Sequence, residues 1–149
     1  MNISTRGRYG LRALLEMAIE SKKGPVTIRD ISEKQRISIT YLEQIFHKLK
    51  KAGVLKSVRG AKGGYILAKE NNQITVREII DILDGPISTS YCDFPQLREK
   101  SCVGPTACVP RILWKELDNK IAKILSGVTL ADLEKKAKIL AEKINRRKV

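Results

Sequence analysis

A helix, a tight connection, a second helix and a glycine-rich hairpin are predicted in succession between residues 27 and 68. Thr27 lies three residues before Asp30, the spacing at which a hydroxyl and a carboxylate cap the start of a helix. Ser38 can cap the following helix, which Gly53 ends. Two helices joined by three or four residues are typical of a helix-turn-helix, so the sequence predicts that motif here.

The second helix of this motif has one apolar and one polar face. Its apolar residues repeat at helical spacing and predict a face buried in the core, namely Leu42, Ile45, Phe46 and Leu49. Thr, Tyr and Gln on the other face can reach base edges or phosphates in a major groove, and lysines can neutralise phosphates. An ordinary solvated surface is the competing interpretation of the same pattern. The residues of this helix expected at DNA are Thr40, Tyr41, Glu43, Gln44, Lys48 and Lys51.

The segment "VLKSVRGAKGGYILA" predicts two strands around a loop with three glycines. Arg59 and Lys62 make the tip of this hairpin basic, and glycine lets a backbone approach a ligand closely. After a helix-turn-helix, such a hairpin is typical of a wing that grips an adjacent DNA groove. A phosphate-binding loop for a nucleotide is the competing idea, but neither of its glycine motifs occurs here.

The charge of the chain favours an acidic polymer as its partner. Among 149 residues there are 29 Lys and Arg against 16 Asp and Glu, which gives a net charge of +13, with the excess in the first half. The sequence shows neither a signal-peptide pattern nor an apolar run that could span a bilayer. We therefore expect a cytoplasmic protein with no membrane partner.

The C-terminal half predicts three more helices. Thr75 and Glu78 repeat the capping spacing before a helix that Gly85 ends, and Pro110 suits the first turn of a longer helix. This longer helix is apolar over much of its circumference, which a winged helix of this size cannot cover alone, so we expect a two-fold homodimer. A last helix begins at Thr129. The residues expected at the dimer interface are Trp114, Leu117, Ile121 and Leu125.

All three cysteines of the chain lie between residues 91 and 111, in a segment with prolines and a glycine. In a reducing compartment, clustered thiols favour metal ligation or redox sensing over a disulfide framework. Zinc remains an alternative, although the spacing lacks the short knuckles of structural zinc sites.

Four segments are distributed along the chain from Ile3 to Leu133, namely "ISTRGRYGLRALLEMA", "ISITYLEQIFHKLKKAGVL", "SVRGAKGGY" and "TLADL". They resemble the bacterial winged-helix family that includes the iron-sulfur cluster regulator, the nitric-oxide-sensing repressor and the cysteine-metabolism repressor. The resemblance implies a mainly α fold with a small β-hairpin, in which a long C-terminal helix forms the dimer. It implies a winged helix-turn-helix DNA-binding domain at 1–86, a cysteine-bearing cluster loop at 87–109, and a dimerisation helix with a C-terminal helix at 110–149.

In this family the cluster-binding members use three cysteines before the dimerisation helix, a position that Cys92, Cys102 and Cys108 occupy. The resemblance thus implies an iron-sulfur cluster, 2Fe-2S in preference to 4Fe-4S. The fourth ligand is unidentified, because Arg111 replaces the histidine of the iron-sulfur regulator and Arg8 replaces the aspartate of the nitric-oxide sensor. The open options are an exogenous thiol or water, no cluster at all, or a carboxylate of Asp93, Glu99 or Glu116.

The expected function is that of a homodimeric transcription regulator which senses cluster status, or redox state and nitric oxide through the cluster. Its operators would serve iron-sulfur biogenesis genes, and the assembly machinery is a further expected partner. The alternative is a cluster-free regulator that senses a partner enzyme or thiol oxidation, as cysteine-metabolism repressors do. Enzymatic activity is not expected, because the only histidine, His47, lies on the helix predicted to enter DNA. Glu43 either tunes operator choice, as the resemblance implies, or is a plain surface carboxylate.

Overall fold

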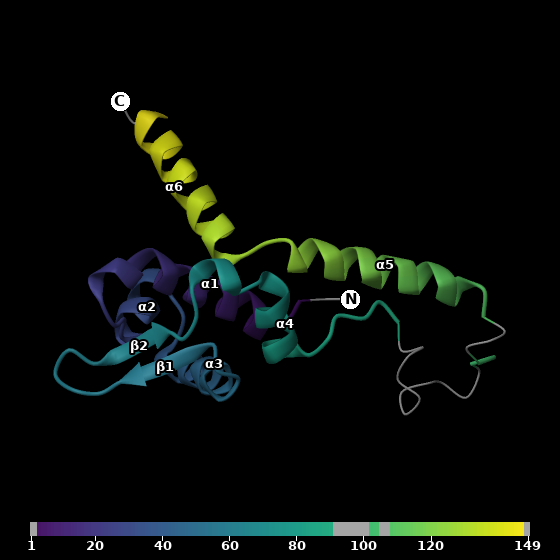
Figure 1. The fold of residues 1–149 in the computed structure, drawn as a ribbon, viewed down its shortest axis with the longest axis horizontal. Helices are drawn as coiled ribbons and strands as arrows, with labels where there is room; N and C mark the ends of the chain where they lie inside the picture. The colour runs from purple at the N-terminus through teal and green to yellow at the C-terminus, as the bar shows by residue number, and fades with distance from the viewer. Residues whose placement is uncertain (1–2, 91–101, 105–107, 148–149) are drawn as a thin grey trace.

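The computed structural model describes residues 3–90, 102–104 and 108–147. The fold is mainly helical with one small antiparallel sheet, as the sequence predicts (Figure 1). In chain order the elements are α1 (Thr5–Glu20), the 3-10 turn η1 (Ser21–Lys23), α2 (Ile28–Gln35), α3 (Ile39–Lys51), β1 (Leu55–Val58), β2 (Gly64–Leu67), the 3-10 turn η2 (Asn71–Gln73), α4 (Val76–Asp84), α5 (Pro110–Ser126) and α6 (Leu130–Arg147).

Helices α1 to α4 and the start of the sheet enclose one hydrophobic core. Leu14 of α1, Ile31 of α2, Phe46 of α3 and Ile79 of α4 are all fully buried. Each such side chain contributes about 1.5–3 kcal/mol relative to an exposed one. The apolar faces of α1 to α4 are thus buried in this one cluster.

Strands β1 and β2 form a hairpin whose register runs from Leu55 opposite Leu67 to Val58 opposite Gly64. Val26 extends the pairing on the outer side of β2, since its backbone exchanges hydrogen bonds of 2.9 and 2.8 Å with Tyr65. Gly64 has a φ of +155°, and a Cβ there would lie 2.6 Å from the carbonyl oxygen of Val26. Only glycine therefore allows the loop before α2 to lie against the hairpin.

The capping residues expected from the sequence lie at the starts of their helices. Thr27 and Asp30 form a reciprocal capping box at α2, and the Thr75 hydroxyl accepts the Glu78 amide hydrogen at α4. At α6, the amide of Thr129 donates to the Asp132 carboxylate at 2.9 Å, and its hydroxyl donates at 2.7 Å. These two hydrogen bonds lower the pKa of Asp132.

Helices α5 and α6 leave the winged helix in different directions (Figure 1). The base of α6 belongs to the core, because Leu130 is fully buried and its amide donates to the carbonyl of Ile74 at 3.0 Å. The amide of Val76 likewise donates to Val128 at 2.9 Å. Both helices are thus held at residues 128–130, while no described side chain of α5 is buried.

Candidate nucleic-acid interface and cysteine segment

A tight turn sets the angle between α2 and α3. Arg36 ends α2 in the left-handed conformation, with a φ of 54°, and the Ser32 hydroxyl donates to the carbonyl of Ile37 at 2.6 Å. From α1, the Arg12 guanidinium donates to the carbonyl of Gln35 at 2.6 Å. Ser38 then caps α3 by accepting the amide hydrogen of Tyr41 at 3.4 Å. These contacts form the helix-turn-helix that the sequence predicts.

Helix α3 divides between core and solvent. The apolar residues expected in the core are all fully buried, namely Leu42, Ile45, Phe46 and Leu49. The opposite face is exposed at Thr40, Glu43, Gln44, His47, Lys48 and Lys51. Because one face is held by the core, the other is presented as a fixed row of polar and basic groups.

Four of the residues expected at DNA, Thr40, Glu43, Gln44 and Lys48, line one shallow hollow of about 650 Å³. Arg6 and His47 complete its lining. Arg6 comes from the first turn of α1 and donates weakly to the carbonyl of Leu83 at 3.4 Å. The sequence does not place Arg6 at this surface, because Arg6 lies beside the exposed face of α3 only through the packing of α1 on α4.

Tyr41 differs from the expected outward position, because it is half-buried and packs against the core. Its ring meets the Tyr9 ring edge-on, with 5.8 Å between the two ring centroids. The Arg12 guanidinium lies over the Tyr9 ring, 5.4 Å from its centroid. Part of Tyr41 is therefore committed to holding α3 against α1.

The hairpin tip presents the other two expected cations, Arg59 and Lys62, both exposed. The tip is a compact turn, since the Gly63 amide donates to the carbonyl of Gly60 at 2.9 Å. At the base of the hairpin, the Lys50 ammonium donates to the Ser57 hydroxyl at 2.9 Å, which joins α3 to β1. Residues 48–62 contain six basic residues and no acid, so the end of α3 and the hairpin are both positively charged.

The expected dimer surface lies on α5. Trp114 is 37% exposed and Leu117 is 40% exposed, while Ile121 and Leu125 are half-buried. Neighbouring apolar side chains are more open, with Ile124 at 66% exposed. In the single chain, much of the apolar surface of α5 is therefore exposed to solvent.

The cysteine segment is described only in part. Cys102 is exposed and Cys108 is half-buried, two residues before α5 begins. Among residues 3–90, 102–104 and 108–147, no group of three His, Cys, Asp or Glu side chains could hold a metal. The remaining expected ligands, Cys92, Asp93 and Glu99, lie outside the described residues.

Two contacts of α5 bear on this segment. The Asp118 carboxylate accepts the Thr89 amide hydrogen at 2.7 Å and the Ser88 hydroxyl hydrogen at 3.3 Å, so the chain leading to the first cysteine is attached to α5. Glu116, an expected alternative ligand, pairs with Lys120 at 2.6 Å, and that hydrogen bond lowers the pKa of Glu116.

A capped helix-turn-helix, followed by a basic hairpin, defines the winged-helix class. Residues 3–136 match the Rrf2 family, which is described as an iron-dependent transcriptional regulator, and the chain belongs to that family. Its relatives are transcriptional regulators and not enzymes, in agreement with the prediction from the sequence.

Two curated relatives named HTH-type transcriptional regulator IscR illustrate the likeness. The one from Pectobacterium atrosepticum is 41% identical over 140 residues, which is 94% of this chain and 83% of the relative. The one from Photorhabdus laumondii is 40% identical over the same shares of both chains.

Solved structures agree with the family. CymR, the global cysteine regulator of B. subtilis, is 36% identical with a TM-score of 0.77, over 91% of this chain and 98% of that one. T. potens IscR is 37% identical with a TM-score of 0.74, over 92% and 88%. Within the described part of the chain, no helix is long and apolar enough to cross a membrane.

Proposed function

We propose that this protein is a sequence-specific DNA-binding regulator which inserts α3 into a major groove and rests the β1–β2 tip on the adjacent phosphates. The observation that carries the proposal is the exposed face of α3, whose opposite face is fully buried, beside a hairpin tip with two exposed cations. Gln44 and Thr40 would read base edges, and Lys48, Lys51, Arg59 and Lys62 would contact phosphates.

Glu43 is the only acid on this face, and it lines the same hollow as Arg6 and Lys48. Phosphates repel the Glu43 carboxylate, which weakens binding unless the DNA offers a compensating contact. A cytosine amino group in the major groove can donate a hydrogen bond to this carboxylate, so Glu43 would favour operators with a cytosine at that position. Tyr41 would act chiefly by holding α3 on α1, because its ring is already packed against Tyr9.

Fluorescence anisotropy with operator and random duplexes across a salt series tests these roles. Lys48→Met or Arg59→Met should weaken binding to both duplexes and reduce the slope of log K against log salt by about one unit. Gln44→Ala should weaken only operator binding, by about 1–3 kcal/mol. Equal weakening of both duplexes by Gln44→Ala would contradict base reading. Lys138→Met, which removes an exposed lysine of α6, is the matched control.

We also propose that the protein is a two-fold homodimer through α5. Support comes from the open apolar surface of α5, which includes Trp114 at 37% exposed and Leu117 at 40% exposed. A second copy of α5 would remove these side chains and Ile121 and Leu125 from water, and would set two α3 helices to read two half-sites. In this arrangement residues 1–86 bind DNA and residues 110–149 join the subunits, apart from the base of α6, which belongs to the core.

The finer proposal is that Cys92, Cys102 and Cys108 hold an iron-sulfur cluster, 2Fe-2S in preference to 4Fe-4S. The donor set fits, because thiolates are the usual ligands of such clusters. When bound, the cluster supplies a centre that oxygen, nitric oxide or iron supply can alter. The chain's own residues would carry that state to DNA, since Asp118 of α5 holds Ser88 and Thr89 of the segment that leads to Cys92.

A cluster-free regulator that senses thiol oxidation or a partner enzyme is the second candidate. Its support is the likeness to CymR of B. subtilis, the global cysteine regulator of that organism. Anaerobic purification with an absorption spectrum and with iron and sulfide analysis separates the two. Visible absorption that is lost in Cys102→Ala and Cys108→Ala supports the cluster, and a colourless, iron-free protein after reconstitution supports the second candidate.

A further inference from the structure

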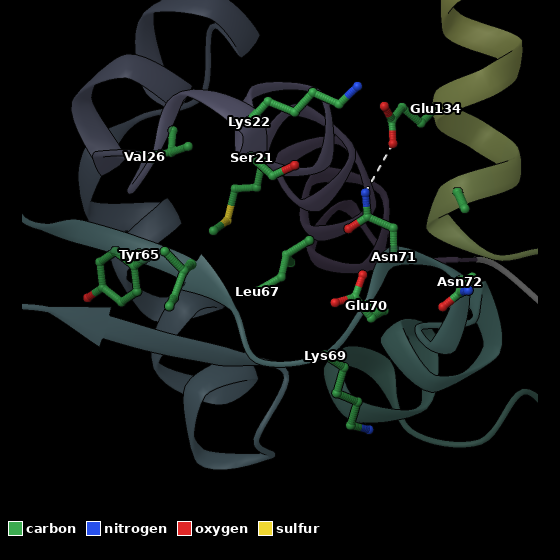
Figure 2. Close-up of a pocket in the computed structure, with 14 residues that line it drawn as sticks. Ser21, Lys22, Val26, Tyr65, Leu67, Lys69, Glu70, Asn71, Asn72 and Glu134 are labelled. Carbon is green, nitrogen blue, oxygen red and sulfur yellow. Dashed lines mark hydrogen bonds between the residues drawn. The ribbon is translucent and has the colours of Figure 1, made fainter.

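A cavity of about 530 Å³ lies between the end of α1, β2, η2 and the first turns of α6 (Figure 2). This volume falls within the roughly 300–1,000 Å³ of small-molecule sites. It lies away from α3's exposed face and from the cysteines, because none of those residues line it. Three segments far apart in the sequence build it, residues 17–26, 65–72 and 131–134, so the cavity is a product of the tertiary fold.

The floor of the cavity is apolar and firmly held. Met17 and Val26 are buried, and Tyr65 and Leu67 of β2 pack against the core. The backbone of Val26 pairs with Tyr65 through two hydrogen bonds. A floor that is fixed in this way can accept the hydrocarbon part of a ligand without rearranging.

The rim carries charges of both signs. Lys22 lies on one side and points towards Glu134 of α6, and Glu70 lies on the other side (Figure 2). The remaining rim charges are engaged: Lys69 pairs with Glu78 at 2.6 Å, and Glu134 accepts hydrogen bonds from Lys138 at 2.7 Å and Asn71 at 3.0 Å.

The side chains of Lys22 and Glu70 make no hydrogen bond or ion pair with any residue in the described part of the chain, although the backbone carbonyl of Glu70 accepts the Gln73 amide hydrogen at 2.9 Å. Lys22 acts on Glu134 only through space, as one of the smaller causes that lower the pKa of that carboxyl. An apolar floor between an uncommitted ammonium and an uncommitted carboxylate matches a molecule that carries one carboxylate, one amine and an apolar part.

We propose that this cavity binds a small zwitterion in which an apolar chain separates the two charges, an ω-amino acid, with its carboxylate at Lys22 and its ammonium at Glu70. The amide groups of Asn71 and Asn72 would supply further hydrogen bonds at the rim. A charged ligand group gains most from a charged partner at a partly enclosed site, which makes these two residues the determinants of affinity.

The position of the cavity makes the ligand an effector. Tyr65 lines it and also packs edge-on against Phe46 of α3, with ring centroids 5.0 Å apart. Glu134 brings in α6, whose base is held beside α4 and follows α5. A ligand that contacts β2 and α6 together therefore favours one placement of the C-terminal helices relative to the winged helix, and this regulatory part rests on the proposed function.

Isothermal titration of the full-length protein with a series of unbranched ω-amino acids of increasing chain length tests binding without DNA. We expect at least one to bind, while its N-acetyl and carboxamide derivatives bind at least about tenfold more weakly because each lacks one charge. Lys22→Met and Glu70→Gln should each weaken binding by a similar factor. The control Lys23→Met removes the next lysine, which pairs with Glu20 outside the cavity and is exposed.

The absence of binding by every member of the series up to millimolar concentration would overturn the proposal, as would binding that Lys22→Met and Glu70→Gln leave unchanged. Adding the bound amino acid to the operator anisotropy assay then tests the effector role. A shift in operator affinity that Lys22→Met abolishes supports it, and an unchanged affinity in a protein that binds both ligands overturns it.

Discussion

Phe46 is the residue whose removal should most disturb α3. It is fully buried at the centre of α3 and packs edge-on against Tyr65 at 84° between ring planes. Phe46→Ala leaves a cavity that the surrounding helices fill only partly, so we expect a loss of about 3–5 kcal/mol in the free energy of unfolding. The aromatic pair should account for about 0.5–1.5 kcal/mol of this loss.

Urea denaturation followed by far-ultraviolet circular dichroism measures this loss at one fixed protein concentration. Fluorescence is unsuitable, because the only tryptophan, Trp114, lies on α5. A double-mutant cycle of Phe46→Leu and Tyr65→Leu isolates the pair. Ile66→Ala, at a β2 side chain that is 37% exposed, is the control and should cost far less. A loss below about 1 kcal/mol for Phe46→Ala would refute the role of Phe46 as the anchor of α3.

Three further substitutions test other parts of the structure. If the proposed dimer forms through α5, sedimentation velocity should show a dimer for wild type and a monomer for Ile121→Glu, and a dimer in both would contradict the α5 interface. Thr129→Val keeps the backbone hydrogen bond to Asp132 and removes the hydroxyl one, the second of the two causes that lower the pKa of this carboxyl, so it should destabilise the protein at neutral pH, with a difference from wild type that becomes smaller below about pH 4 as the carboxylate is protonated. A difference that does not change with pH would refute the contribution of the Thr129 hydroxyl to the lowered pKa of Asp132. Gly64→Ala should cost about 1–3 kcal/mol in urea denaturation, because its Cβ would meet the Val26 carbonyl oxygen at 2.6 Å, and a neutral effect would contradict that contact.

Features encoded by local spacing could be predicted from the sequence. The capping pairs at Thr27, Thr75 and Thr129 depend on residues three apart, and the buried face of α3 depends on a repeat of three and four. The positive charge of the hairpin tip comes from Arg59 and Lys62, two residues of one short segment. These features follow from the chain within one or two helical turns, which a sequence displays directly.

Features produced by contacts between distant segments could not be predicted. Arg6 reaches the α3 surface only because α1 packs on α4, and Tyr41 is half-buried only because Tyr9 faces it. Leu130 fits the apolar repeat of a C-terminal helix, yet it completes the core of the winged helix. The cavity bordered by Lys22 and Glu70 likewise joins segments whose proximity no local pattern records.

Selection of binding sites from a random duplex library, with the full-length protein and with Gln44→Ala, tests the central claim most directly. We expect wild type to enrich an inverted repeat whose half-sites lie about one helical turn apart, because two α3 helices related by a two-fold axis read it together. Gln44→Ala should lose preference at defined positions within each half-site while keeping its affinity for unselected DNA. Enrichment of no motif by the wild-type protein, or of the same motif with the same preference by Gln44→Ala, would contradict the assignment of α3 as the element that reads DNA.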